Sequence, residues 1–190
     1  MTALFEPIRD ALARRPPQLQ DAGPEARWAA VALVLAPAGD GAPQALLIRR
    51  AEREGDPWSG HVALPGGRRE PADLDLLTTA RRETREETGV DLDAALYLGQ
   101  LDDLHPTRGI RPPIVVRPYV FAFARKPALR PNWEVAESLW TPLEALRAGR
   151  VTSRIHVGDR ARDVPSLLLG PHVLWGMTLR IVDGFLGRLD

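Results

Sequence analysis

The sequence predicts an α/β fold, built as one domain over residues 1–190. The chain is long enough for a single domain with a sizeable core. Aliphatic runs bounded by Gly, Pro and Asp alternate with segments whose apolar residues have helical spacing. An acidic helical segment lies in the middle of this alternation, and no internal repeat or low-complexity linker interrupts it. Together these features indicate strands and helices that share one core.

The N-terminal third of the chain predicts a helix followed by a hairpin. Residues 1–25 form a helix and its lead-in, because apolar side chains recur at helical spacing over 4–14 and two prolines follow. Aliphatic runs over 28–35 and 44–50 flank Gly39-Asp40-Gly41, a turn signal between two strands. A polar loop then leads to the acidic helix.

The middle of the chain predicts two further strands, over residues 96–104 and 114–124. The connection between them, 105–113, is rich in Pro and Arg, and we expect an active-site loop there. A helix is expected over 140–146, because Thr141-Pro142 resembles a cap followed by Pro at the first helical position.

The C-terminal part of the chain predicts a small hairpin and a closing helix. The hairpin is expected over residues 151–169. Aliphatic residues at helical spacing over 173–189 predict the helix that ends the chain.

The central helix carries three acidic residues that share one face. Glu83, Glu86 and Glu87 are separated by three and four residues, which brings their side chains together. Like charges at this spacing cost about 0.2–0.5 kcal/mol per pair. The probable C-cap Gly89 places the last two acids near the negative end of the helix dipole. A bound divalent cation explains why a sequence accepts both costs.

The residue types also indicate which metal would bind. Oxygen ligands suit hard cations, and Mg²⁺ in particular is held by a few carboxylates together with substrate phosphates; Mn²⁺ is an alternative. The competing interpretation is a solvated face whose acids pair with Arg81, Arg82 and Arg85. The Gly66-Gly67 turn just upstream favours the metal site.

The overall composition excludes several classes of function. Lys+Arg and Asp+Glu both number 25, so no global field attracts nucleic acid or an anionic membrane. A chain without cysteine has no disulfide, thiolate metal site or Cys nucleophile. No apolar run approaches the roughly 20 residues of a membrane span. The N-terminus lacks a basic and then apolar signal, so we expect a cytoplasmic protein.

The glycine turn and the acidic helix together resemble the Nudix box. The positions that match are Gly67, Asp73, Arg82-Glu83, Glu86-Glu87 and Gly89-Val90. The chain departs from the pattern in having Asp rather than Glu at the first acidic position, one extra residue before Arg82, and Thr84 in place of an aliphatic residue. None of these changes removes a metal-ligand position.

The resemblance to the Nudix family implies an αβα sandwich with a mixed β-sheet. It also implies hydrolysis of the diphosphate bond of a nucleoside diphosphate linked to another group. The implied ligands of Mg²⁺ are the carbonyl of Gly66 and the carboxylates of Glu83, Glu86 and Glu87. Arg82 would hold the box together by pairing with Asp73 across the turn. The expected partner is thus a small nucleotide substrate, and relatives suggest a homodimer.

The loop upstream of the box looks like the signature of coenzyme A-cleaving Nudix hydrolases. It runs from Leu46-Leu47-Ile48-Arg49-Arg50-Ala51 to Gly60-His61-Val62-Ala63-Leu64-Pro65-Gly66-Gly67. The predicted substrate-binding residues are Arg49, Arg50, Trp58, His61 and Arg108. The arginines could donate to phosphates and Trp58 could stack on a base. The alternative places the arginines at solvated strand ends and uses Trp58 in packing.

The general base and the substrate are open at this stage. Glu134 is the candidate base in a downstream loop, and Glu137 is the alternate. Pro106 lies near a proline typical of ADP-ribose-cleaving relatives, so ADP-ribose or NADH is the second substrate prediction. A non-catalytic Nudix-fold binding domain would be expected to lose box acids. A prenyl diphosphate isomerase would need a catalytic cysteine, which this chain lacks.

Overall fold

Strand β1 (Arg27–Pro37) is the centre of the fold in the computed structural model, which describes residues 3–22, 25–56, 58–105, 114–157 and 160–190. It pairs in parallel with β6 (Ile114–Ala122) along one edge. Its other edge pairs antiparallel with β2 (Pro43–Arg50) and with the short β4 (Gly66–Arg68). The sheet is therefore mixed, and β1 is buried on both faces, as its almost continuous apolar sequence suggests.

The remaining strands extend this sheet on both sides. β5 (Leu96–Gln100) pairs antiparallel with the outer edge of β6. β2 pairs antiparallel with β7 (Val135–Pro142) and, near its end, with β3 (Val62–Ala63). The order of strands is β3-β2-β1-β6-β5, with β4 beside β1 and β7 beside β2.

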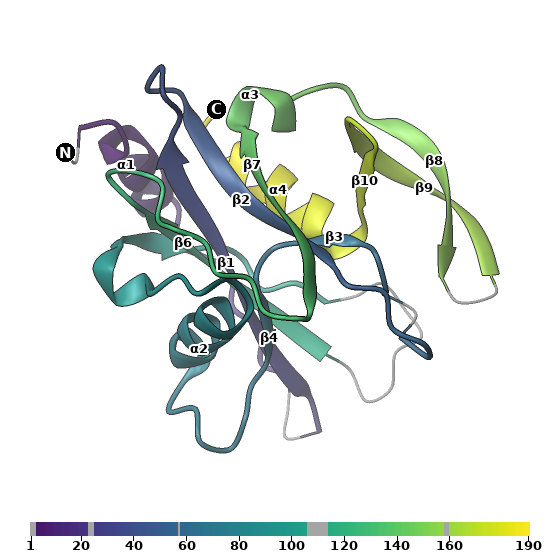
Figure 1. Cartoon of the computed structure of the whole chain (residues 1–190). Coiled ribbons are helices and arrows are strands. Elements are labelled where there is room, and N and C mark those ends of the chain that lie inside the picture. The colour runs from purple at the N-terminus through teal and green to yellow at the C-terminus, as the bar shows by residue number, and fades with distance from the viewer. Residues whose placement is uncertain (1–2, 23–24, 57, 106–113, 158–159) are drawn as a thin grey trace.

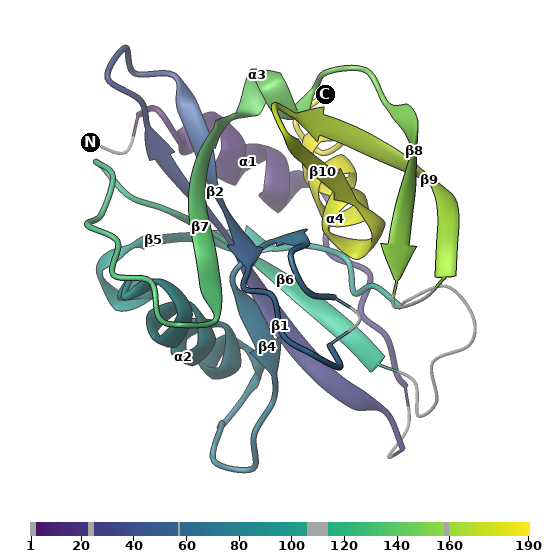
Figure 2. The same ribbon diagram turned by 45° about the vertical axis from the view of Figure 1, so that its right-hand side comes forward.

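Helices cover both faces of the sheet, which confirms the αβα sandwich (Figures 1 and 2). The helices are α1 (Glu6–Arg14), α2 (Leu76–Thr88), the 3₁₀ helix η1 (Leu92–Ala94), α3 (Leu143–Leu146) and α4 (Gly176–Leu186). α1 and α4 pack with Leu33 and Leu35 on one face, whereas α2 packs with Ala32 and Val34 on the other. Among the described residues, no helix has the length and apolarity that a membrane crossing requires.

A second, three-stranded sheet extends beside the first (Figure 1). Its strands are β8 (Val151–Val157), β9 (Arg160–Leu169) and β10 (His172–Trp175), all antiparallel. The first two confirm the hairpin expected over residues 151–169. β10 lies against β3, so the end of the chain reaches the loop that precedes the glycine turn.

Two predicted helices need correction. The helix expected over 140–146 is wrong for its first half, because Trp140–Pro142 continue β7 and pair with β2; only Leu143–Leu146 is helical. The Thr-Pro pair that suggested a helix start lies in β7, which pairs only with β2 in the described sheet, and such an edge strand tolerates proline. The C-terminal helix begins at Gly176 rather than at residue 173, because β10 pairs with β9 first.

The strand predicted over 96–104 is shorter than expected. β5 ends at Gln100, and Leu104 joins the sheet only through an isolated bridge to Val116. Most of the predicted active-site loop, residues 106–113, lies outside the described residues.

Candidate active site

The helix that carries the candidate carboxylates is fixed at both ends. The Oδ1 atom of Asp75 accepts a hydrogen bond from the Thr78 N–H at 2.7 Å and caps the N-terminus. Gly89 ends the helix with φ of 72°, and its N–H donates to the Arg85 carbonyl at 2.9 Å. This geometry confirms the predicted glycine C-cap. The acidic residues therefore occupy the last two turns of α2.

The turn upstream of α2 has room only for glycine. A Cβ on Gly66 would lie 2.3 Å from the Ala30 carbonyl oxygen and 2.5 Å from the Val31 Cα, and its φ of 147° also favours glycine. A Cβ on Gly67 would lie 2.4 Å from the carboxylate carbon of Glu83. The two glycines thus let one backbone segment touch both β1 and the acidic helix.

Glu87 is the most buried carboxylate of the helix, at 3% exposed. Its Oε2 accepts a hydrogen bond from the Gly66 N–H at 2.8 Å. Burial raises the pKa of Glu87 to about 7; the hydrogen bond and Arg50 oppose this, whereas the charges of Glu83 and Glu134 add to it. The pKa of Glu83 is also raised, chiefly by burial. For Glu83 and Glu87, the nearby positive charges therefore do not offset the cost of burying the carboxylates.

Arg82 supplies positive charge beside these carboxylates. Its Nε and Nη2 donate to the two carboxylate oxygens of Asp73, each at 3.0 Å, which confirms the predicted pair. Nη2 also donates to the Arg68 carbonyl at 3.0 Å. Nη1 lies 3.0 Å from Glu83 Oε1 and 3.1 Å from Glu86 Oε2. One guanidinium thus joins the glycine turn, the loop before α2 and two of the acids.

Asp73 is buried beneath this guanidinium. Besides Arg82, it accepts hydrogen bonds from the Glu70 N–H and the Thr79 hydroxyl, each at 2.9 Å. Its pKa falls to about 2, mainly because of the hydrogen bonds from Arg82, which outweigh its burial. Asp73 therefore stays ionised and orients Arg82 at neutral pH.

The carbonyl of Gly66 is free of the sheet ladder. In the antiparallel pair of β1 and β4, the Ala32 N–H donates to the Pro65 carbonyl at 2.8 Å and the Arg69 N–H to the Trp28 carbonyl at 2.9 Å. Hydrogen-bonded pairs alternate along such a ladder, so Gly66 falls at a position whose backbone groups point away from β1. Its N–H already reaches Glu87, and its carbonyl is available as a ligand.

The donor set fits a hard divalent cation. One carbonyl and three carboxylates offer only oxygen atoms, the ligands that Mg²⁺ and Mn²⁺ prefer. Within the residues that the structure describes, no three His, Cys, Asp or Glu side chains are gathered in the geometry of a metal site. Glu83 and Glu86 are turned onto Arg82 instead. The residues thus match a metal in chemistry, while Arg82 balances part of their charge in this arrangement.

Glu134 approaches the acidic helix from the loop before β7. Its carbonyl accepts a hydrogen bond from the Ala51 N–H at 2.7 Å, which ties this loop to the end of β2. Its Oε1 lies 3.4 Å from Nη1 of Arg53, whose guanidinium stacks 4.2 Å from the ring centroid of Trp133. The Asn132 N–H of the same loop donates to the Glu87 carbonyl at 3.0 Å, so the loop lies against the end of α2, and the charge of Glu134 raises the pKa values of Glu83 and Glu87.

The other predicted site residues fall into three groups. Arg49 and the alternate base Glu137 pair with each other, Nε to Oε2 at 3.7 Å, and the same Glu137 oxygen lies 3.3 Å from His172 Nε2. These contacts link β2, β7 and β10. Arg108 and Pro106, by contrast, lie outside the described residues, so their predicted roles stay predictions.

Arg50, Trp58 and His61 do come together. Nη2 of Arg50 donates to Asp56 Oδ2 at 2.9 Å, and its N–H donates to the His61 carbonyl at 3.0 Å. The Trp58 N–H donates to Asp56 Oδ1 at 3.0 Å. The rings of Trp58 and His61 both lie against Trp175, with centroids 6.0 Å and 5.1 Å away. Burial lowers the pKa of His61, which keeps its ring neutral at pH 7.

Two residues of this region, Asp56 and Trp175, received no site role from the sequence. Asp56 carries a local signal, since Asp often accepts from the N–H two residues later, as it does here with Trp58. Trp175 carries no local signal for its position, because only the pairing of β10 at the end of the chain brings it to the loop.

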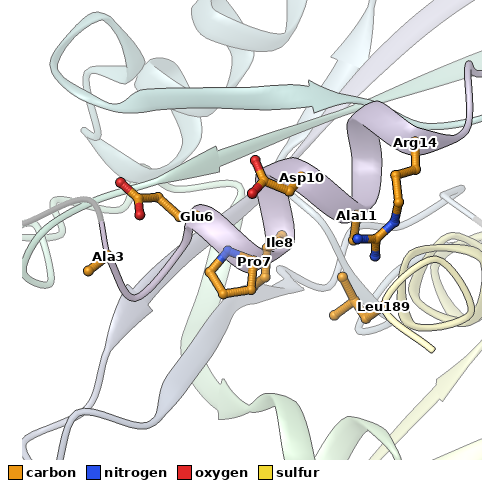
Figure 3. A pocket seen from close by; sticks show the side chains of 8 residues that line it. All are labelled: Ala3, Glu6, Pro7, Ile8, Asp10, Ala11, Arg14 and Leu189. Carbon is orange, nitrogen blue, oxygen red and sulfur yellow. The ribbon is translucent and has the colours of Figure 1, made fainter.

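Surface depressions lie beside α2 and beside α1. One of about 640 Å³ lies along α2 and is lined by Thr78, Arg81, Arg82, Arg85, Glu86, Asp91 and Asp93. Another, of about 470 Å³, lies at α1, where Figure 3 shows Glu6, Asp10 and Arg14 beside Pro7 and Leu189. None of the predicted site residues lines the second depression, whereas Arg82 and Glu86 line the first.

Comparison with known proteins agrees with this geometry. The model of the NUDIX domain matches residues 26–159, and the chain belongs to the Nudix family. The computed structure superposes on the NUDIX domain of Shewanella oneidensis NrtR complexed with ADP ribose with a TM-score of 0.59 at 20% identity, covering 95% of this chain and 97% of that one. At that identity the likeness shows the fold alone.

Two curated relatives are similar in sequence. An uncharacterized protein of Schizosaccharomyces pombe is 40% identical over 120 residues, which is 60% of this chain and 36% of the yeast protein. The mitochondrial coenzyme A diphosphatase NUDT8 of Homo sapiens is 33% identical over 150 residues, which is 75% of this chain and 61% of the human protein. The chain thus spans less than two thirds of either relative.

Proposed function

We propose that this chain is a Mg²⁺-dependent pyrophosphohydrolase that cleaves the diphosphate bond of a nucleoside diphosphate linked to another group, with coenzyme A or a derivative as substrate. The observation that carries the proposal is the contact between the Gly66-Gly67 turn and the acidic end of α2. It gathers oxygen donors around a buried carboxylate, in a chain whose family matches over residues 26–159.

Gly66, Glu83, Glu86 and Glu87 would hold the metal. When bound, the cation would lower the pKa of a water molecule and neutralise charge on the leaving phosphate. Arg82 holds two of these carboxylates at the end of α2 while Asp73 holds Arg82. Glu87 is fixed by its hydrogen bond to Gly66. These contacts keep the carboxylates at one end of α2, and a bound metal would take over the positive charge that Arg82 provides to Glu83 and Glu86.

Glu134 would take the proton of the attacking water. A general base must lie within hydrogen-bond reach of that proton or reach it through one water, and Glu134 lies near the ligand carboxylates. Its Oε1 lies 3.4 Å from Nη1 of Arg53, a contact that holds the side chain beside the end of β2. Glu137 is the weaker candidate, because its carboxylate already contacts Arg49 and His172.

Arg50 would bind the diphosphate of the substrate. Its charge acts on Glu87, so it lies beside the acidic helix, and its Nε is buried without a hydrogen-bond partner among the described residues. A guanidinium donates to two phosphate oxygens at once, which suits this role. Arg49, one residue earlier in β2, is a second donor.

The choice of coenzyme A has two supports. The upstream loop resembles the signature of coenzyme A-cleaving relatives, and the human relative is named a coenzyme A diphosphatase. ADP-ribose and NADH are the alternative substrates, and a binding domain without activity is the alternative class.

A substrate panel separates these possibilities. The protein is incubated with Mg²⁺ and with coenzyme A, ADP-ribose, NADH or a nucleoside triphosphate, and the products are identified by chromatography and mass. Preferential cleavage of coenzyme A to phosphopantetheine and adenosine 3′,5′-bisphosphate is the expected result. Turnover of ADP-ribose alone contradicts the substrate, and no turnover of any compound contradicts the activity.

A further inference from the structure

Three aromatic rings from distant segments gather beside the glycine turn. Trp58 comes from the loop after β2, His61 from the start of β3 and Trp175 from the end of β10. Trp58 and Trp175 have centroids 6.0 Å apart and planes tilted by 33°, and His61 meets both rings edge-on, at 69° and 81°. Trp58 is nevertheless 43% exposed, so a large part of its surface stays open to solvent.

The spacing of the rings decides where a flat ligand could stack. Carbon atoms in contact lie about 3.5–4.0 Å apart, so a ring inserted between two indoles needs about 7 Å between them. The 6.0 Å between Trp58 and Trp175 is too short for that. Trp175 and His61 therefore pack against the Trp58 indole without leaving room for a ligand between the rings. A flat ligand can stack only on the exposed part of the indole, which we call the platform.

One carboxylate couples this platform to the phosphate-binding side chain. Asp56 accepts from the Trp58 N–H with Oδ1 and from Arg50 Nη2 with Oδ2, at 3.0 Å and 2.9 Å. Arg50 also bonds through its N–H to the His61 carbonyl at 3.0 Å. The backbone of Trp58 and the guanidinium of Arg50 are thus bonded to the same carboxylate, while the rings of His61 and Trp175 pack against the indole.

The platform lies close to the acidic helix. The Arg50 N–H donates to the His61 carbonyl at 3.0 Å, and the charge of Arg50 lowers the pKa of both His61 and Glu87, so Arg50 lies near both residues. Gly66 follows His61 by five positions, which limits the distance between their Cα atoms to about 18 Å. A nucleotide whose base lies on Trp58 can therefore direct its phosphates toward Arg50 and the acidic helix.

We infer that the exposed part of the Trp58 indole is the subsite for the nucleobase of the substrate, and that Asp56 holds the backbone of Trp58 beside Arg50. This inference rests on the proposed function. Base–aromatic stacking tolerates every base, because each has a π-face. The subsite thus selects nucleotides over phosphates that lack a base, and leaves the choice among bases to other contacts.

Another exposed indole competes for this role. Trp133 is 66% exposed and also lies near the site, beside Glu134. However, the Arg53 guanidinium lies 4.2 Å from the centroid of its ring and covers one face. This difference favours Trp58, and Trp133→Leu is the matched control.

Titration calorimetry without metal tests the inference. The probes are adenosine 5′-monophosphate and ribose 5-phosphate, which differ in the base. Stacking of about 1–3 kcal/mol per base predicts that wild type binds the nucleotide about 5- to 150-fold more tightly. Trp58→Leu is expected to abolish this preference, Trp58→Phe to retain most of it, and Trp133→Leu to leave it unchanged.

Several outcomes would overturn the inference. These are equal binding of both probes by wild type, an unchanged preference in Trp58→Leu, or its loss in Trp133→Leu. Circular dichroism of each variant checks that the fold is intact. The calorimetric measurement needs no hydrolysis, so it tests the subsite separately from the proposed function. If the protein proves inactive but prefers the nucleotide through Trp58, the subsite stands and the activity does not. If the protein is active but shows no such preference, the activity stands and the subsite does not.

Discussion

The Gly66 N–H donates a hydrogen bond to the Oε2 atom of Glu87 at 2.8 Å, and this contact joins the two halves of the candidate site. The bond fixes the carboxylate of a residue that is 3% exposed. The carbonyl of the same glycine points away from β1. The N–H of Gly66 therefore orients a carboxylate oxygen of Glu87, and the carbonyl of Gly66 is a second candidate ligand of the metal.

Substitution of the two glycines should have different consequences. In Gly66→Ala the new Cβ meets backbone atoms of β1 at 2.3–2.5 Å and the backbone is strained at φ of 147°. We expect a loss of about 2–4 kcal/mol in the free energy of unfolding. In Gly67→Ala the three atoms nearest to the new Cβ all belong to the carboxylate of Glu83, a side chain that can rotate away. Stability should then change little while activity falls.

Chemical denaturation and turnover of both variants check this pair. Gly41→Ala is the control, since Gly41 has φ of 85° but nothing within 4 Å of its Cβ. Gly41→Ala should lose about 1–3 kcal/mol in the free energy of unfolding, because its backbone is strained at positive φ, and it should keep its activity. A stable, active Gly66→Ala protein would contradict the close approach described above.

The buried pair of Asp73 and Arg82 should contribute measurably to stability. The pKa of Asp73 falls from 3.8 to about 2 on folding, which corresponds to about 2 kcal/mol. Because the folded-state pKa is lower, this contribution is fully present above pH 3.8 and is lost as the pH falls toward 2. Asp73→Asn should therefore be about 2 kcal/mol less stable at pH 7.

Urea denaturation at several pH values tests this prediction. The difference between wild type and Asp73→Asn should shrink between pH 4 and pH 2, because wild-type Asp73 becomes protonated there. Asp93→Asn is the matched control, since Asp93 is exposed and pairs with Arg81 at the surface. Its effect should stay within about 0.5 kcal/mol. Equal losses in the two variants would refute the role of burial.

Loss of the Asp56 carboxylate should weaken substrate binding more than chemistry. Burial opposes ionisation of Asp56, but hydrogen bonds from Trp58 and Arg50 outweigh it and hold its pKa below the usual value. Asp56→Ala removes the acceptor of both hydrogen bonds. We therefore expect KM to rise about 10-fold, which corresponds to the loss of one or two hydrogen bonds, with a smaller change in kcat. Steady-state kinetics with Glu54→Gln, an exposed neighbour, as control measures the split. A fall in kcat alone would contradict the positioning role.

Sequence patterns were sufficient for the parts of the fold that local signals control. α2 ends at the predicted C-cap Gly89, and the chain turns where Gly39-Asp40-Gly41 predicts it. The helix expected over 140–146 was wrong because pairing of β7 with β2 outweighs a local Thr-Pro signal. Tertiary contacts also moved the start of α4 to Gly176, since β10 pairs first.

The candidate site was predictable to a similar degree. The pair of Arg82 with Asp73 follows from the box and is present. The contact of Glu87 with Gly66 spans a turn whose path no local pattern specifies. Likewise, the position of Trp175 beside Trp58 depends on a second sheet at the end of the chain. Spacing along a helix is visible in sequence, whereas contacts between separate elements are not.

Binding of Mg²⁺ should depend on the carboxylates of α2. Glu83→Gln keeps the shape of the side chain but removes one ligand charge, so we expect calorimetric affinity for Mg²⁺ to fall at least about 10-fold. Glu144→Gln on α3 changes an exposed acid elsewhere and should leave affinity unchanged. Equal affinity in the two variants would place the metal away from this helix.

The rate of diphosphate cleavage by Glu86→Gln and Glu87→Gln, at saturating Mg²⁺ and coenzyme A, tests the central claim most directly. Removing charge from a metal ligand should lower kcat at least about 10²-fold in each variant relative to wild type and to Glu144→Gln. Near-normal turnover in both variants, with the fold intact, would contradict a metal-dependent site at the acidic end of α2.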